Sequence, residues 1–247
     1  DTGNNEVYQT GLVIGRGTMN FDGVNDYVDL MSESLITGTG DFTVSCWASW
    51  VEAVNNAIWN QRDTSSANPS CGLYIRTTGG VRFETYNGGY EQVATGANTN
   101  LNTGGLHHIV CVRDGTNSIK LYVNGVLDGS DTGGNNVSLT AVDFQLGRNT
   151  GGSGYLEGFI DEFAMWPDIA LSASEIRTLY NNGIPYDATN VQSDNLQGYW
   201  RNDGVGIWDD RTTNDNDGTP SGSPSVLFFP EGSTAGEDIL SFPLADT

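Results

Sequence analysis

Positive charge is scarce in this sequence. Its 247 residues include 10 lysines and arginines, of which only Lys120 is a lysine, against 31 aspartates and glutamates. The formal net charge is therefore −21 at pH 7. Because nucleic-acid binding depends on cationic side chains that neutralise phosphates, we expect no nucleic acid as a direct partner. An anionic membrane surface is disfavoured for the same electrostatic reason.

The sequence also lacks long hydrophobic runs and a cysteine framework. No apolar stretch approaches the roughly 20 residues that a membrane-spanning helix needs, so we expect no membrane insertion. The three cysteines, Cys46, Cys71 and Cys111, form no disulfide framework and show no Cys-x-x-Cys or Cys/His metal spacing. Cys46 and Cys111 fall in apolar strand patterns, which favours small buried hydrophobic residues. A bridge between these two cysteines is the alternative.

Glycine and short alternating apolar patterns dominate what is present. The 33 glycines indicate strands joined by tight turns. Phe42, Val44 and Cys46 alternate with polar or large residues, which is the period of a half-buried strand. Asn124-Gly125 predicts a hairpin, since both residues tolerate positive φ. We expect strands at residues 19–23, 26–30, 42–47, 57–59, 72–76, 81–86, 108–113, 119–123, 126–127, 142–147, 158–166, 196–200, 206–208 and 226–229.

One helix interrupts the strands. Residues 172–175 read Ser-Ala-Ser-Glu, a capping box in which the serine and glutamate side chains satisfy each other's backbone N–H groups. Ile176, Leu179 and Tyr180 share one face at helical spacing. Gly183 is expected to supply a left-handed C-cap. This amphipathic helix is expected to pack its apolar face against the strands.

Several of these strings keep the order and spacing of one known family. They are residues 21–28 (FDGVNDYV), 42–47 (FTVSCW), 107–110 with 121–125 (HHIV and LYVNG), and 158–163 with the helix at 171–183. Together they resemble the laminin-G-like domains of the concanavalin A-like lectin/glucanase superfamily over about residues 17–184. The resemblance implies an all-β fold, a two-sheet antiparallel β-sandwich of the jelly-roll type with one short α-helix on its C-terminal side.

The resemblance also suggests how the chain is divided. Strings in residues 196–219 resemble what usually precedes the Phe-Asp-Gly strand in this family, yet here they follow the helix. The fold is then circularly permuted, with the tail adding a strand to its own sandwich, or the tail serves a following repeat or a neighbouring subunit. We expect the first arrangement, because β-sandwich termini are often adjacent. The expected parts are an N-terminal arm (1–17), the jelly-roll domain (18–186) and a C-terminal segment (187–247).

Catalysis by a glycosidase needs two carboxylates close together, and the sequence shows no such pair. Retaining glycosidases place two carboxylates about 5–5.5 Å apart, and on a strand this closeness comes from acids at i and i+2. The glucanases of this fold carry a Glu-x-Asp-x-Glu string, which is missing here. Glu84 has no second acid two residues on, and adjacent Asp161 and Glu162 are expected to point to opposite faces. His107 and His108 are also consecutive, and no Gly-x-Ser-x-Gly string is present, so we expect no enzyme activity.

Calcium is the cofactor that the resemblance implies. Related folds hold a structural calcium between the early loop and the closing strand, which here points to Asp22 and Asp161, with Asp26 assisting. Such cations take carboxylate and carbonyl oxygens. Alternatively, Asp22 accepts from turn N–H groups and Asp161 caps a loop. Four acids of the tail lack EF-hand spacing and are interpreted as a solvated loop: Asp209, Asp210, Asp215 and Asp217.

Exposed aromatic rings flanked by polar groups bind the faces of sugars. Trp59, Tyr86 and Tyr90 lie near loop-rich stretches and are the candidate carbohydrate contacts, although aromatic residues of β-sandwiches often belong to the core. Trp47 and Trp166 are assigned to the core outright.

The function that we expect from the sequence is non-catalytic surface binding. The acidic, Gly/Asn/Asp-rich composition resembles structural proteins of tailed bacteriophages. That resemblance implies a decoration protein on the virion surface, with other virion proteins, copies of this chain (a homo-oligomer) and surface glycans as partners. One alternative is a secreted, extracellular bacterial carbohydrate-binding or adhesion module, and another is a degenerate glycoside hydrolase.

Overall fold

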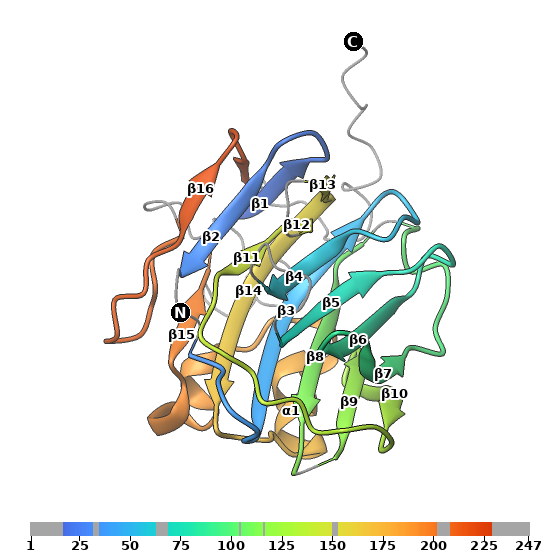
Figure 1. The fold of residues 1–247 in the computed structure, drawn as a ribbon. Coiled ribbons are helices and arrows are strands. Elements are labelled where there is room, and N and C mark those ends of the chain that lie inside the picture. The colour runs from blue at the N-terminus through green and yellow to red at the C-terminus, as the bar shows by residue number, and fades with distance from the viewer. Residues whose placement is uncertain are drawn as a thin grey trace.

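A computed structural model describes residues 17–31, 35–62, 69–103, 105–115, 117–149, 153–201 and 208–228. It is a sandwich of two antiparallel sheets with one short helix on its outside, as Figure 1 shows. The expected all-β fold is therefore confirmed. The expected N-terminal arm, except for residue 17, lies outside the described residues.

The larger sheet has eight strands. In spatial order it contains β10 (Val126–Asp131), β9 (Ile119–Val123), β8 (His107–Arg113), β3 (Phe42–Trp50), β14 (Glu157–Pro167), β1 (Gly17–Asp22) and β17 (Ser225–Phe228), with β15 (Gly198–Trp200) also paired to β14. β9 and β10 form the expected hairpin. Its turn residues Asn124 and Gly125 have φ values of 51° and 76°, as a two-residue hairpin turn requires.

The facing sheet has seven strands. They are β16 (Thr219–Ser221), β2 (Tyr27–Met31), β11 (Phe144–Leu146), β4 (Ala57–Gln61), β5 (Ser70–Ile75), β6 (Val81–Tyr86) and β7 (Tyr90–Thr95). A two-stranded ribbon, β12 (Arg148–Asn149) with β13 (Ser153–Tyr155), lies beside this sheet.

The core lies between the sheets and is rich in aromatic rings. Phe42 and Phe83 meet edge to face across it, and Phe144 contacts Phe163 in the same way. β3 is buried along its whole length rather than on one face. The expectation of a half-buried strand is wrong here, because other parts of the chain cover the outer side of β3. Trp47 and Trp166 are buried as predicted.

Helix α1 (Ala173–Tyr180) covers part of the outer face of the eight-stranded sheet. Its capping box is present as predicted, and Ile176 and Leu179 are buried. The left-handed C-cap is Asn181, with a φ of 43°, rather than Gly183. Asparagine tolerates this conformation, so the helix ends two residues earlier than the glycine indicated. Three 3-10 turns follow: η1 (Asn181–Gly183), η2 (Ala188–Asn190) and η3 (Ser193–Asn195).

No helix in the described ranges has the length and hydrophobicity needed to cross a bilayer. The cysteines are buried and free, so no bridge joins Cys46 to Cys111. β3 and β8 are neighbours, but Cys46 lies opposite Ile109 and Cys111 lies opposite Val44. The interpretation of the two cysteines as small buried hydrophobic residues is confirmed.

The C-terminal segment adds strands to both sheets of the same sandwich. β15 pairs with β14, β16 with β2, and β17 with β1. The buried Asp26 fastens this segment, because its carboxylate accepts from the N–H of Ser223 (2.7 Å) and from the N–H of Asp22 (3.1 Å). The described part of this segment, residues 187–201 and 208–228, therefore packs on the sandwich that precedes it.

Asp210 organises the loop before β16. Its buried carboxylate accepts from the N–H groups of Tyr199 (3.0 Å), Thr212 (2.9 Å) and Asn216 (3.1 Å), and from the Thr212 hydroxyl (2.9 Å). Asp217 in turn accepts from the N–H of Asp210 (2.8 Å). The interpretation of this stretch as a solvated loop is wrong for Asp210, because the loop folds around its side chain.

Candidate functional site

The structure separates the three aromatic candidates. Trp59 has no exposed surface and stacks on Phe144 in the core, with ring centroids 5.3 Å apart. The prediction that Trp59 contacts carbohydrate assumes an exposed ring, and that assumption is wrong. Tyr86 and Tyr90 instead lie opposite each other on β6 and β7, with centroids 5.7 Å apart in an edge-to-face arrangement. The side chain of Tyr90 is 61% exposed.

Strand alternation places this pair on the outer face of the seven-stranded sheet. Phe83 and Ala94 pair across β6 and β7 and point into the core, so the side chains of Arg82, Glu84 and Tyr86 point outward. The turn between the strands contains Gly88, whose φ is 72°. A register shift beside Tyr86 brings Tyr90 opposite it. β7 itself is not among the strands expected from the sequence.

Two arginines lie against these tyrosines. The guanidinium carbon of Arg62, from the end of β4, lies 5.5 Å from the centre of the Tyr86 ring. That of Arg82 lies 5.7 Å from the Tyr90 ring and 5.8 Å from the Tyr74 ring of β5. Gly72 makes room, since a Cβ there would approach the Tyr74 ring to 2.8 Å. We call Arg62, Tyr74, Arg82, Glu84, Tyr86 and Tyr90 the tyrosine–arginine platform.

Glu84 is the acid of this platform. It is buried, and its carboxylate lies 2.8 Å from Nε of Arg82. Burial raises the pKa of Glu84, whereas the positive charges of Arg82 and Arg62 act to lower it. Burial also raises the pKa of Tyr74, and the Glu84 charge adds to that effect. Arg62 forms a hydrogen bond with the Tyr74 side chain, so the polar groups hold one another in place.

A second polar row continues along the same face of the sheet. Arg148 lies over the ring of Tyr27, 3.4 Å from its centre, and donates to Gln145 (3.0 Å). Gln145 donates to Asp29 (2.6 Å), which is 4.0 Å from Arg148. Arg62, Arg82 and Arg148 are three of only ten cationic residues in the chain. This face therefore carries three of the chain's few cationic side chains, beside the acids Glu84 and Asp29.

Of the three proposed calcium ligands, Asp22 and Asp26 are neighbours, but Asp161 lies apart from them. Asp22 accepts from the N–H groups of Val24 (2.8 Å) and Asn25 (3.2 Å), as the alternative interpretation describes, and Asp26 binds backbone as above. Asp22 lies opposite Glu157 of β14, and Asp161 is four residues further along that strand, a separation of about 13 Å. Over the described ranges, no group of three or more His, Cys, Asp or Glu residues is placed to hold a metal. These three aspartates do not fit a calcium site.

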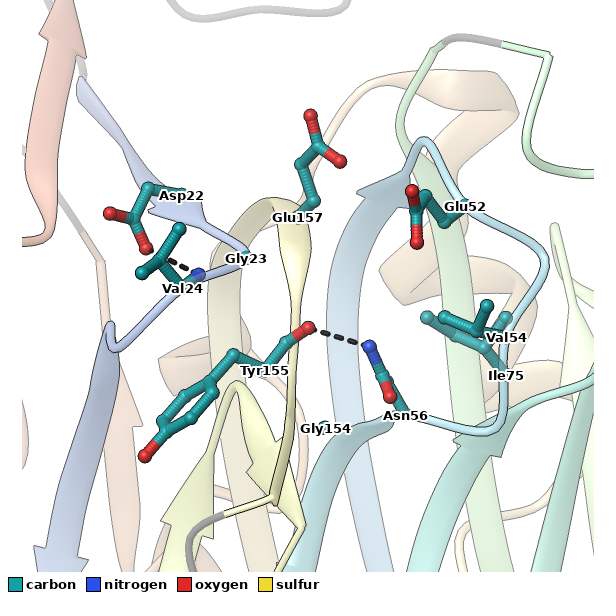
Figure 2. Close-up of a pocket in the computed structure, with 10 residues that line it drawn as sticks. All are labelled: Asp22, Gly23, Val24, Glu52, Val54, Asn56, Ile75, Gly154, Tyr155 and Glu157. Carbon is teal, nitrogen blue, oxygen red and sulfur yellow. Dashed lines mark hydrogen bonds between the residues drawn. The ribbon is translucent and has the colours of Figure 1, made fainter.

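A pocket of about 490 Å³ opens at one end of the sandwich. Figure 2 shows Glu52, Asn56, Tyr155 and Glu157 around it, with Asn56 donating to the backbone oxygen of Tyr155 (2.6 Å) and Asp22 turned toward the N–H of Val24. None of its three carboxylate side chains is buried. The pocket therefore lacks the desolvated acid that serves as proton donor in a glycosidase.

Comparisons with known proteins agree with this architecture. A family model described as the concanavalin A-like lectin/glucanases superfamily matches residues 22–177. The chain belongs to this superfamily. A search of the curated proteins found no match.

Solved structures show the same fold. A candidate carbohydrate-binding protein from Bacteroides ovatus is 20% identical, with a TM-score of 0.62 over 86% of this chain and 60% of that one. A heptameric SAP-like pentraxin from Limulus polyphemus is 15% identical, with a TM-score of 0.52 over 68% of this chain and 83% of that one. This chain thus spans less than two thirds of the Bacteroides protein. The expected likeness to bacteriophage proteins stays a prediction.

Because the superfamily is named in part for glucanases, the adjacent acids of β14 need attention. Ile160 and Phe163 both point into the core, because a β-bulge places two residues of β14 opposite one of β3. The intervening Asp161 and Glu162 therefore lie on the same outer side, and the expectation of opposite faces is wrong. Glu162 accepts from the Tyr199 hydroxyl and lies 3.4 Å from Nε of Arg201. This buried ion pair links β14 to the end of β15. Its role is therefore structural.

A serine–histidine pair also lies on the eight-stranded sheet of this lectin-like sandwich. The hydroxyl of Ser45 is 2.9 Å from Nε2 of His108, and both side chains are buried. Among the described residues, Nδ1 of His108 has no hydrogen-bond partner. Burial lowers the pKa of His108 to about 3. Without an acid on Nδ1 to orient it and without access to solvent, the pair lacks the arrangement of a hydrolytic triad.

His108 is expected to make folding stability depend on pH. Its pKa falls from 6.5 to about 3 on folding, so below pH 6.5 the unfolded chain binds a proton that the folded chain does not. Lowering the pH from 7 to 5 therefore destabilises the wild type by about 2 kcal/mol more than His108→Gln, which can still bond Ser45. Urea unfolding of both proteins at the two pH values measures this difference. Equal pH dependence in the two proteins would contradict it.

Proposed function

We propose that this protein binds glycans without catalysing a reaction, and that the tyrosine–arginine platform is its binding surface. The observation that carries the proposal is the pairing of the exposed Tyr90 with Tyr86 on the outer face of the seven-stranded sheet, beside Arg82 and Glu84. An exposed ring stacks on the apolar side of a sugar. A neighbouring guanidinium donates hydrogen bonds to the sugar hydroxyl groups, and a neighbouring carboxylate accepts hydrogen bonds from them. Membership of a lectin/glucanase superfamily supports this assignment.

Tyr90→Ala is expected to weaken glycan binding roughly tenfold or more, because it removes the most exposed ring of the platform. Tyr90→Phe keeps the ring and is expected to retain most of the affinity. A glycan array identifies a ligand for the wild type, and calorimetry with that ligand then measures all variants. Glu52→Gln, in the pocket of Figure 2, is the matched control and should bind like the wild type.

Three results would count against the proposal. Binding that survives Tyr90→Ala and Tyr86→Ala would remove the platform from the site. Loss of binding in Glu52→Gln alone would move the site to the pocket. Release of shortened products from the bound glycan would show that the protein is an enzyme.

The expected role in a virion is a separate prediction. It places the chain on the virion surface with other virion proteins and further copies of itself as partners, whereas the alternative is a secreted adhesion module. Imaging of the chain in its native particle or on the cell surface distinguishes the two, and both are compatible with glycan binding.

A further inference from the structure

We propose that the platform selects glycans with a terminal or isolated carboxylate, such as a uronic acid, and that Arg62 and Arg82 receive that carboxylate. The inference rests on the proposed function, because it names the ligand class of the same surface. Its first basis is the arrangement of charged side chains on the platform. Arg82 lies 2.8 Å from the buried Glu84 carboxylate and beside the Tyr90 ring, and Arg62 lies over the Tyr86 ring. The platform thus places two arginines beside its tyrosine rings in a chain of net charge −21.

The two guanidinium groups are held in fixed positions. Arg62 lies over Tyr86 and hydrogen-bonds the Tyr74 side chain. Arg82 lies near the Tyr74 and Tyr90 rings, and its Nε lies 2.8 Å from the Glu84 carboxylate. A planar guanidinium offers a fork of N–H groups that matches the two oxygens of a carboxylate. Groups restrained before binding lose less conformational entropy when a ligand arrives.

The exposed ring and the cation are also close enough for one sugar to reach both. The guanidinium carbon of Arg82 is 5.7 Å from the centre of the Tyr90 ring, and 27% of the Arg82 side chain is exposed. A sugar stacked on Tyr90 therefore brings a carboxylate on its own ring beside Arg82. A neutral sugar makes the same stacking contact without this charge pair.

Acids beside the platform restrict the ligand further. β10 lies beside β7, and its Asp131 and Asp128 accept from the N–H groups of Val93 (2.8 Å) and Asn98 (3.0 Å). These carboxylates add negative charge along the β7 edge of the platform. A polymer with an acid on every sugar would place further carboxylates against them. One acidic sugar, rather than a polyanion, therefore fits the charge pattern.

The test compares two tetrasaccharides that differ only in the terminal residue, glucuronic acid in one and glucose in the other, with the methyl ester of the acid as a third probe. Calorimetry with the wild type is expected to give roughly tenfold tighter binding of the free acid than of either neutral form. Arg62→Gln and Arg82→Gln should each reduce this preference to about threefold or less.

Two further variants keep the test specific. Arg177→Gln makes the same charge change on the exposed side of α1 and should keep the full preference for the acid. Arg62→Lys keeps the charge but loses the fork, and should give an intermediate preference. Thermal melting confirms that each variant is folded.

The outcomes separate the two proposals. Equal binding of the acid and neutral forms overturns the preference for a carboxylate and leaves glycan binding by the platform in place. A loss of preference in Arg177→Gln equal to that in Arg62→Gln overturns the assignment to the platform arginines. Binding of none of the three probes, with no ligand on a glycan array, overturns the proposed function and this inference with it.

Discussion

Trp59→Ala is expected to lower the free energy of unfolding by about 3–5 kcal/mol, the range for removing a large ring from a packed core. Trp59 has no exposed surface, and its ring centre lies 5.3 Å from that of Phe144 and 6.0 Å from that of Phe83. The alanine variant loses these contacts and leaves a cavity between the two sheets. Chemical denaturation followed by far-UV circular dichroism measures the loss.

Tyr90→Ala is the control for this experiment, because it removes an exposed aromatic ring from the same sheet and should change stability by no more than about 0.5 kcal/mol. Trp59→Phe fills part of the cavity and should lose less than the alanine variant. A Trp59→Ala protein with wild-type stability and defective glycan binding would restore the residue as a ligand contact and contradict the structure.

Asp210→Ala is expected to destabilise the protein by about 3 kcal/mol, because one side chain satisfies four donors and each orphaned buried group costs roughly 1–3 kcal/mol. Three of those donors are backbone N–H groups, those of Tyr199, Thr212 and Asn216. Water can reach some of them once the loop relaxes, so the loss is smaller than the sum. Hydrogen exchange should show early opening of β15, whose Tyr199 N–H loses its partner.

Two variants bracket this prediction. Asp209→Ala removes the adjacent acid and should remain within about 0.5 kcal/mol of the wild type. Asp210→Asn keeps one acceptor oxygen and should fall between the wild type and the alanine variant. If Asp210→Ala and Asp209→Ala unfolded at the same denaturant concentration, the loop would not depend on this carboxylate.

Much of the fold follows from local patterns in the sequence. Alternating residues on β3 and β6, the Asn124-Gly125 turn and the capping box of α1 each act over a few residues, so they can be recognised without a partner. β7 and β16 carry no comparable signal. Glu91 and Gln92 interrupt any apolar alternation on β7, and β16 is the short sequence Thr-Pro-Ser. Both strands form because a neighbouring strand offers hydrogen bonds to them.

The candidate site was only partly predictable for a related reason. Tyr86 and Tyr90 are joined by a short turn, so their proximity is visible in the sequence. Arg62 reaches Tyr86 only because β4, β5 and β6 are adjacent. Trp59 is a candidate in the sequence because it lies near loop-rich stretches, but it lies opposite Leu73 in the core. For Asp161 and Glu162 the error comes from the bulge in β14, which turns both to the same side. A strand's period alone does not reveal where such an extra residue sits.

The strands of the C-terminal segment also constrain how this molecule folds as it is synthesised. The side chain of Asn20 donates to the hydroxyl of Ser225, which lies 205 positions later in the sequence. Likewise, β2 cannot pair with β16 until that strand has been synthesised. Pairings over such distances have a high loop-closure cost and slow folding. While the ribosome is still adding residues 219–228, β1 and β2 each present an unpaired edge, the kind of surface on which nascent chains aggregate.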